Sequence, residues 1–288
     1  MKEKKINIDA LKYILDRLEI ENKNIYLGID LFSLLKHLNI KNYNYFESTE
    51  YVLNYIKDTL GKEANIIIPV FNFDCVIKKK FYKISSNGQS GAFGNILLKK
   101  YFNLRTYHPM YSFLCFGKKV NDYKKNRNKN ATGKNSLWKN FIDEKYDLIT
   151  IGHHWNRSFT HVHYIENLLN VDYRFNLNFS VKYFETRKKF FNKNFSFFAR
   201  KDEICEFSGV TFNCDKLFMK EKISKFYKYK NLISFKLNIN QASKMLIEDL
   251  RKNSENLISY IRPNKTNKKV LNSEDGTMLS LEKKYLKL

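Results

Sequence analysis

The apolar and polar positions of the first 75 residues alternate between helical spacing and strand spacing. Apolar residues at helical spacing follow Asp9, which we expect to cap a helix. Residues 24–31 place apolar side chains on alternate positions, and residues 65–71 form a short apolar run, as buried strands do. Between them a second helix is expected over residues 48–60, with Gly61 placed to end it. This order predicts an α/β core with a largely parallel central sheet flanked by helices.

The remainder of the chain continues this order and then changes. The pattern predicts a polar loop over residues 78–91. Helices are expected over residues 92–102 and about 157–170, and buried strands over residues 110–116 and 148–152. Aromatic and polar residues alternate over 176–184 and 194–200, which predicts a more antiparallel, β-rich C-terminal half, and a helix is expected over 241–261. No repeat or clear linker interrupts the chain. We therefore expect a single domain over residues 1–270 and a polar C-terminal tail over 271–288.

Composition narrows the class of protein. The 288 residues are 43% hydrophobic, with only 10 Gly and 3 Pro, which excludes a collagen-like, linker-rich or disordered chain. Lys and Arg number 52 against 29 Asp and Glu, so the formal charge is +23. Such a charge attracts polyanions, namely nucleic acid, anionic lipid or a phosphorylated cofactor. Alternatively, the abundance of Lys, Asn, Ile, Tyr and Phe reflects an A+T-rich genome, and the charge follows from that composition.

The cysteines and the apolar runs indicate the compartment. The four cysteines, at positions 75, 115, 205 and 214, show neither a disulfide framework nor a zinc spacing, so we expect buried free thiols. The Lys-rich N-terminus has no apolar segment after it, so no signal peptide is expected. No apolar run approaches the roughly 18 residues that a transmembrane segment needs. These features predict a cytoplasmic protein.

A cluster of histidines is the strongest local anomaly. Four of the six histidines lie within residues 153–163, and the first two, His153 and His154, follow a buried strand where open α/β sheets place their ligand crevices. Thr160, His163 and Glu166 are spaced three apart, which brings consecutive pairs together on a helix. A neutral imidazole near a carboxylate can act as a general base near pH 7. A metal site is the alternative, but no Cys-x-x-Cys accompanies the histidines and no metal is expected; they could also be surface or core histidines.

Other patterns limit the chemistry. Asp74 follows a buried strand, either at the crevice edge or as an ordinary loop carboxylate. No Gly-x-Ser-x-Gly elbow is present, and residues 88–94 lack the Gly-Lys-Ser/Thr of a phosphate loop. Kinase, nucleotidase and dehydrogenase functions therefore have little support. A nucleic-acid-binding protein remains an alternative, because residues 118–134 are basic and residues 190–198 are rich in aromatic side chains.

Four motifs in register resemble the aminoglycoside 3-N-acetyltransferase family, including relatives that modify sugars. The resemblance runs from Ile25 to about Arg200. The strand and turn over 26–33 are similar to the family's first strand, and the strand over 66–71 is similar to its Pro-Thr-Phe-like strand. The stretch over 90–113 is similar to the part of the family pattern that ends in its Arg-Ser/Thr-x-His-Pro strand. The most specific piece is Ile151-Gly152 followed by Thr160-x-x-His163-x-x-Glu166, which is similar to the family's Leu-Gly…Thr-x-x-His-x-x-Glu.

The resemblance implies direct transfer of an acetyl group from acetyl-CoA to an amino group of an amino sugar, without an acyl-enzyme. The implied catalytic residues are His163, Asp74 and Glu185, with His163 held by Glu185 or Asp74. The implied cofactor-binding residues are Gly28, Ile29, Asp30, Leu31, Ser33, Ser90, Gly91, His108 and Thr160. The implied substrate-binding residues are Asn72, Asp74, His153, His154, Glu166 and Glu185. Thr160 or backbone N–H groups would stabilise the oxyanion.

The chain also departs from the family pattern. The family's His-Ser-Ser turn is Gly28-Ile29-Asp30 here, so two hydroxyl donors toward CoA are missing. A chain with a charge of +23 suits a polycationic antibiotic poorly. We therefore expect an anionic acceptor, such as a nucleotide-linked or polysaccharide-precursor amino sugar, with an aminoglycoside antibiotic as the alternative. The expected partners are acetyl-CoA and this acceptor, without nucleic acid, and a homodimer is the assembly considered.

Overall fold

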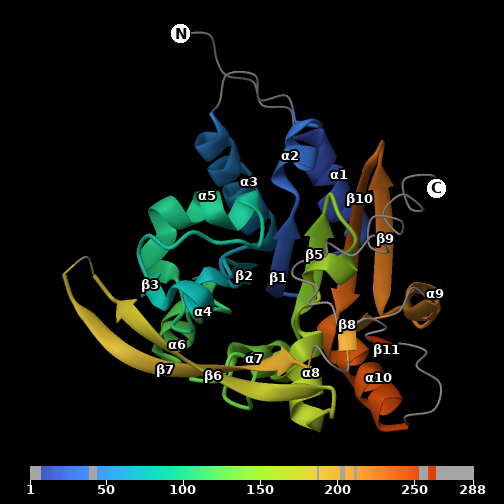
Figure 1. Ribbon diagram of the computed structural model, residues 1–288. Coiled ribbons are helices and arrows are strands. Elements are labelled where there is room, and N and C mark those ends of the chain that lie inside the picture. Colours follow the sequence, from blue (N-terminus) through green and yellow to red (C-terminus); the bar gives the residue numbers. More distant parts are fainter. Residues whose placement is uncertain are drawn as a thin grey trace.

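A computed structural model describes residues 8–38, 44–186, 188–201, 205–210, 213–252 and 259–263. Its centre is a six-stranded sheet, shown in Figure 1. The strand order is β4 (Phe113–Phe116), β2 (Asn65–Pro69), β1 (Asn24–Ile29), β5 (Asp147–Ile151), β10 (Leu232–Asn238) and β9 (Ser224–Tyr229). The three central strands β2, β1 and β5 are parallel, whereas β4, β10 and β9 pair antiparallel at the edges. The α/β fold class is confirmed, with the parallel pairing confined to the centre of the sheet.

The central strands are apolar on both faces because a helical layer covers each face. On one face, Ile25, Leu27 and Ile29 pack with buried side chains of α1 (Asp9–Leu18), α3 (Tyr45–Leu60) and α5 (Ala92–Tyr101). On the other face, Tyr26 and Leu148 pack with α7 (Leu137–Asp143), α8 (Val162–Leu169) and α10 (Ile239–Lys252). Alternate residues of one strand therefore belong to two separate cores, as the period of a strand requires.

A second sheet carries the antiparallel part of the chain. It consists of β3 (Lys80–Tyr82), β6 (Arg174–Phe184) and β7 (Phe190–Arg200), with β3 parallel to β6 and β6 antiparallel to β7. The long β6–β7 hairpin crosses the lower part of Figure 1, below α3, α4 and α5, and contributes Phe179, Val181 and Phe195 to the core. A further pair of strands, β8 (Cys205–Val210) and β11 (Ser259–Pro263), is antiparallel. The antiparallel character of the C-terminal half is confirmed.

Shorter helices complete the described part of the chain. They are α2 (Leu31–Leu35), α4 (Asp74–Lys78), α6 (Val120–Lys125) and α9 (Asn213–Lys220), with the 3-10 helices η1 (Phe102–Leu104) and η2 (Trp155–Ser158). Within the described ranges no helix is long and apolar enough to cross a membrane. Cys75, Cys115 and Cys214 are buried free thiols, as expected. The expected tail over 271–288 lies outside the described residues.

Several element boundaries differ from the prediction. Asp9 is the first residue of α1 and not its N-cap, which is Ile8, whose side chain makes no capping hydrogen bond. The helix expected over about 157–170 is divided into η2 and α8, with a turn between them. The helix expected over 241–261 ends at Lys252, and the strand β11 begins at Ser259. Strand β3 lies inside the expected polar loop, and β9 and β10, which the pattern did not identify, complete the central sheet.

Candidate active site

A cleft of about 520 Å³ lies at the carboxyl ends of β1 and β2, beside the segment that follows β5. Open α/β sheets bind ligands at this place, because the loops that leave parallel strands meet there. Seven of the nine predicted cofactor-binding residues line it, namely Gly28, Ile29, Asp30, Leu31, Ser90, Gly91 and Thr160. The predicted substrate residue His153 lines it as well. The cleft is therefore formed by segments that are distant in sequence.

The turn after β1 is held by its own side chains. The Asp30 carboxylate caps α2 by accepting hydrogen bonds from the Ser33 backbone N–H at 3.1 Å and from the Ser33 hydroxyl at 2.7 Å. Ser33 is thereby turned toward Asp30 and is not among the residues that line the cleft. Where the family pattern has hydroxyls, this chain therefore has a helix cap formed by Asp30, a residue that lines the cleft.

The floor of the cleft beside Gly28 is a neutral histidine. The Nε2 atom of His153 lies 2.8 Å from the Ser158 hydroxyl. Burial, with a contribution from the Arg157 cation, lowers the pKa of His153 to about 4. A side chain at position 28 would collide with Ser158 and His153. Glycine is required here because the strand passes directly over this pair.

His163 is the central group of the candidate active site. It lies on the first turn of α8, and its backbone N–H donates to the carbonyl of Thr160. Thr160 lines the cleft. The His163 side chain is 23% exposed, and its Nδ1 lies 2.7 Å from Oε2 of Glu166, which is 2% exposed. The other Glu166 oxygen accepts from the Tyr173 hydroxyl at 3.1 Å. The spacing of three residues that marked this pair in the sequence brings the two side chains into contact on the helix.

Arg174, at the start of β6, completes the group around His163. Its Nε lies 2.7 Å from the Glu166 carboxylate, and its Nη2 lies 3.0 Å from His163 Nδ1. Arg174 could donate only to an unprotonated Nδ1, whereas Glu166 accepts only from a protonated one. The shorter contact with the carboxylate favours the tautomer with Nδ1–H, which leaves the lone pair of Nε2 free to accept a proton.

The surroundings keep His163 neutral. Burial and the positive charge of Arg174 lower the pKa of His163, and the opposing effect of Glu166 only partly compensates. A neutral imidazole with an oriented ring is the form that a general base requires. The geometry and the charges around His163 therefore fit proton abstraction near neutral pH.

Tyr111 packs against two phenylalanines of the cleft. Its ring packs against Phe71 and Phe73, at centroid distances of 4.9 and 6.1 Å, and both phenylalanines line the cleft. Burial raises the pKa of Tyr111 to about 12, and the nearby charges of Arg174 and Glu166 act on the same hydroxyl in opposite directions. Tyr111 thus packs against the cleft and lies within electrostatic range of the Glu166–Arg174 pair.

The prediction that Glu185 or Asp74 holds His163 is wrong, because the carboxylate in contact with His163 is Glu166. Glu185 follows the far end of β6 from Arg174 and pairs with Lys193 at 3.1 Å. At about 3.3 Å per residue, that strand separates its two ends by roughly 30 Å. Asp74 pairs with Lys78 and accepts from Gln89; Gln89 lines the cleft, but Asp74 is not among the lining residues.

Three other predicted residues are enclosed by the protein. His108 is 2% exposed and packs against Phe195, so the prediction that it contacts the cofactor is wrong. His154 is 1% exposed, with Nε2 on Asp215 and Nδ1 accepting from a backbone N–H, so its predicted contact with substrate is wrong for the same reason. The amide of Asn72 is buried and holds a neighbouring loop.

The sequence did not identify Arg174, Tyr111 or Arg157. Arg174 reaches Glu166 only because the chain turns back after α8, at Asn170 in the left-handed conformation. The sequence signals this reversal of the chain only through Asn170, since asparagine tolerates the left-handed conformation at a helix end. Within the described residues, no group of three or more His, Cys, Asp or Glu could hold a metal ion.

Comparison with solved structures finds the same fold in several enzymes. A room-temperature neutron and X-ray structure of AAC-VIa with bound sisomicin is 14% identical, with a TM-score of 0.66 over 85% of this chain and 97% of that one. The YokD protein of Bacillus subtilis is 14% identical, with a TM-score of 0.63 over 85% and 98% of the two chains. A binary complex of AAC-IIIb with CoASH is 12% identical, with a TM-score of 0.63 over 85% and 96%.

Sequence comparison with the curated proteins found no match. A family model does match, however: the aminoglycoside 3-N-acetyltransferase model aligns with residues 37–224, which include His163, Glu166 and Arg174. This match covers more than half of the 288 residues. The chain therefore belongs to the aminoglycoside 3-N-acetyltransferase family.

Proposed function

We propose that this protein transfers the acetyl group of acetyl-CoA to an amino group of an amino sugar, with His163 as the general base. As a member of its family the protein is an N-acetyltransferase with acetyl-CoA as co-substrate. The observation that carries the assignment of the base is the neutral His163, oriented by Glu166 and placed one turn from the cleft. The CoA-bound AAC-IIIb structure supports the choice of donor.

The cleft suits the extended arm of the donor. Its walls combine the backbone of the turn at Gly28–Asp30 and of the Ser90–Gly91 loop with the rings of Phe32 and Phe73, which are 49% and 41% exposed. Exposed rings beside a cleft can stack on a flat heterocycle. Arg157, at the same cleft, provides a cation for phosphate.

The reaction needs one proton acceptor and no covalent intermediate. The neutral amine attacks the thioester carbonyl, so a C–N bond forms and the carbonyl oxygen gains negative charge. His163 Nε2 accepts the proton that the nitrogen loses, a step that contributes about 10²–10⁴-fold to the rate. The C–S bond then breaks, and the thiolate of CoA leaves and takes up a proton. The Thr160 hydroxyl or backbone N–H groups at the cleft stabilise the oxyanion.

We further propose that the acceptor is an anionic amino sugar, such as a nucleotide-linked or polysaccharide-precursor sugar. The formal charge of +23 repels a polycation. Three carboxylates are expected to meet substrate, and each is paired with a cation, which leaves it little attraction for an ammonium group. Asp74 and Glu185 are each paired with a lysine, and Glu166 is paired with Arg174. An aminoglycoside antibiotic is the second candidate, because the similar AAC-VIa structure holds sisomicin.

The test of the base is His163→Ala. Thiol release from acetyl-CoA with an amino-sugar acceptor should fall by at least about 10²-fold, because the amine keeps its proton. Thermal stabilisation by CoA should persist, because the cleft is intact. His37→Ala is the matched control, since His37 lies after α2, packs on Tyr229 and does not line the cleft. An unchanged kcat in His163→Ala would contradict the assignment.

A further inference from the structure

The β6–β7 hairpin has a buried face and a solvent face. Phe179, Val181 and Phe195 are buried in the core, whereas Ser180 and Asn194, which pair across the two strands, are exposed. Side chains alternate between the two faces of a strand, so the even-numbered residues from 178 to 184 share the solvent face. The strands β3, β6 and β7 contain lysines and arginines but no Asp or Glu. This sheet therefore presents no negative charge of its own to a partner.

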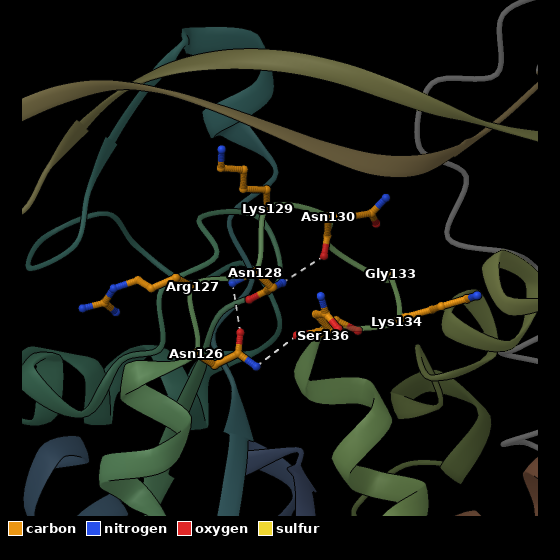
Figure 2. Close-up of a pocket in the computed structure, with 9 residues that line it drawn as sticks. Asn126, Arg127, Asn128, Lys129, Asn130, Gly133, Lys134 and Ser136 are labelled. Carbon is orange, nitrogen blue, oxygen red and sulfur yellow. Dashed lines mark hydrogen bonds between the residues drawn. The ribbon is translucent and has the colours of Figure 1, made fainter.

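A hollow of about 480 Å³ lies on the solvent face. Its polar lining residues are Asn178, Ser180, Asn194, Ser196 and Lys129. The Ser180 hydroxyl donates to Asn194 Oδ1 at 2.8 Å, and the Ser196 backbone N–H donates to the Lys129 carbonyl at 2.9 Å. Figure 2 shows the Lys129 side chain extending from its loop toward the hairpin. One cation is therefore held beside a row of amides and hydroxyls.

Aromatic rings continue this face toward the tip of the hairpin. The ring of Tyr82, on β3, stacks on Phe184 at a centroid distance of 4.2 Å, and Phe184 lies 5.1 Å from Phe190. Tyr82 and Phe190 are 37% and 44% exposed. The Lys182 ammonium lies 4.3 Å from the centre of the Phe190 ring. A second cation therefore accompanies a row of rings that remains open to solvent.

The length of this face indicates the size of a ligand. Asn178 and Phe184 are six residues apart on β6, and a strand rises about 3.3 Å per residue, so the hollow and the rings are separated by about 20 Å. A single sugar or a free phosphate would contact only one end of such a face. A ligand that contacts both the hollow and the rings has to be a chain.

The side chains of this face suit a polysaccharide better than a nucleic acid. Asparagine and serine side chains both donate and accept hydrogen bonds, as sugar hydroxyls do. A nucleic acid is bound mainly by cations, about one Lys or Arg for each phosphate that is neutralised. Here the lysines, at positions 80, 129 and 182, are outnumbered by the amides and hydroxyls, at positions 178, 180, 192, 194 and 196. This ratio fits a chain that is rich in hydroxyl groups and carries widely spaced negative charges.

We propose that the solvent face of the hairpin, from the hollow at Asn178 to the rings of Tyr82 and Phe190, binds a chain of an acidic polysaccharide. The lysines pair with its carboxylates, the amides and hydroxyls bond to its hydroxyl groups, and the rings pack against the apolar C–H faces of its sugars. The proposal goes beyond the proposed function, because binding at this face requires no acetyl transfer. A polymer held here would raise the concentration of its sugars around the protein.

The test compares the double variant Lys182→Gln/Phe190→Ser with Lys12→Gln/Tyr13→Ser, which removes one exposed lysine and one exposed ring from α1. Hyaluronan oligosaccharides, which carry one carboxylate per disaccharide, are titrated into each protein by calorimetry, with neutral dextran and oligodeoxythymidine as further probes. Hyaluronan affinity should weaken by at least about tenfold in the first variant and by less than about twofold in the second, because only the first loses a cation and a ring of the face. Dextran should bind the wild type at least about tenfold more weakly than hyaluronan does.

The outcomes separate this surface from the proposed function. Equal hyaluronan affinity in both double variants, or no hyaluronan binding by the wild type, would overturn the proposal. Oligodeoxythymidine that binds more tightly than hyaluronan and is lost in the first variant would assign the face to nucleic acid and overturn it too. Asn192→Asp places a negative charge at an exposed position and should weaken hyaluronan binding at an unchanged melting temperature. His163→Ala should abolish turnover and retain hyaluronan affinity, so the calorimetry decides the surface even if no sugar is acetylated.

Discussion

At the scale of single residues, Arg174 acts on the protonation of His163, second to burial. It lies within contact distance of both His163 and Glu166, and its charge is one cause of the lowered pKa of His163. The same cation neutralises a carboxylate that is 2% exposed and would otherwise be costly to bury. We therefore expect Arg174 to be a positioning residue, because it would act on the amino-sugar acceptor only through His163 and Glu166.

Arg174→Gln should move the acidic limb of the pH–rate profile upward. Burial, the largest cause of the lowered pKa of His163, would remain, but removal of Arg174 takes away one lowering effect while the raising effect of Glu166 stays, so the pKa should rise. His163 would then be protonated, and inactive as a base, at a higher pH than in the wild type. The measurement is kcat/KM against pH between about 5 and 9.

Arg174→Lys serves as the control, because it retains a cation and should leave the acidic limb closer to that of the wild type. A limb that stays in place in Arg174→Gln, or moves to lower pH, would show that Arg174 does not set the protonation of His163.

At the scale of elements, the contact between α5 and β2 positions one wall of the cleft. Gly94 of α5 lies so close to β2 that a Cβ atom there would be 2.5 Å from the Pro69 carbonyl oxygen. The start of α5 follows Ser90 and Gly91, and both line the cleft. The distance between helix and strand therefore determines where this wall lies.

Gly94→Ala should destabilise the protein, although alanine favours a helix by about 1 kcal/mol over glycine. The Cβ atom would meet a backbone oxygen, which cannot move aside as a side chain can, so we expect a net loss of about 1–3 kcal/mol. Asn54→Ala is the control, at an exposed position of α3, and should leave stability unchanged or slightly higher. The melting temperature is the measurement, and a rise in Gly94→Ala would refute the close contact.

At the scale of the whole molecule, the fold buries histidines within a strongly basic chain. His108, His153 and His161 are at most 8% exposed. Burial lowers the pKa of His108 and His161 to about 3 and that of His153 to about 4. Protonation of these rings would bury a charge and add to a net charge of +23.

The protein should therefore lose stability in mild acid. Each of these folded-state pKa values lies below the unfolded value of 6.5, so their contribution is complete above pH 6.5 and declines as the pH falls toward 4. Each histidine accounts for about 1.4 kcal/mol per pH unit over that range. Chemical denaturation at pH 7.5, 6 and 5 measures this loss, and His161→Asn should reduce its slope. A free energy of unfolding that is constant from pH 7.5 to 5 would contradict the prediction.

The sequence by itself determined the elements with strong periodicity and the identity of the His163–Glu166 pair. Alternate apolar positions in residues 24–31 specify a strand that is buried on both faces, and a spacing of three specifies contact on a helix. Both patterns are local, because the backbone geometry of one element is enough to place the residues.

Only the tertiary structure decided which distant groups meet. It brought Arg174 to Glu166, placed Glu185 at the opposite end of a long strand, and joined the basic loop over 126–136 to α8 through Asn167. Periodicity shows which face of an element is apolar, but not in which direction the chain returns after a turn. The function of a charged residue depends on that return, since the charges around it come from other elements.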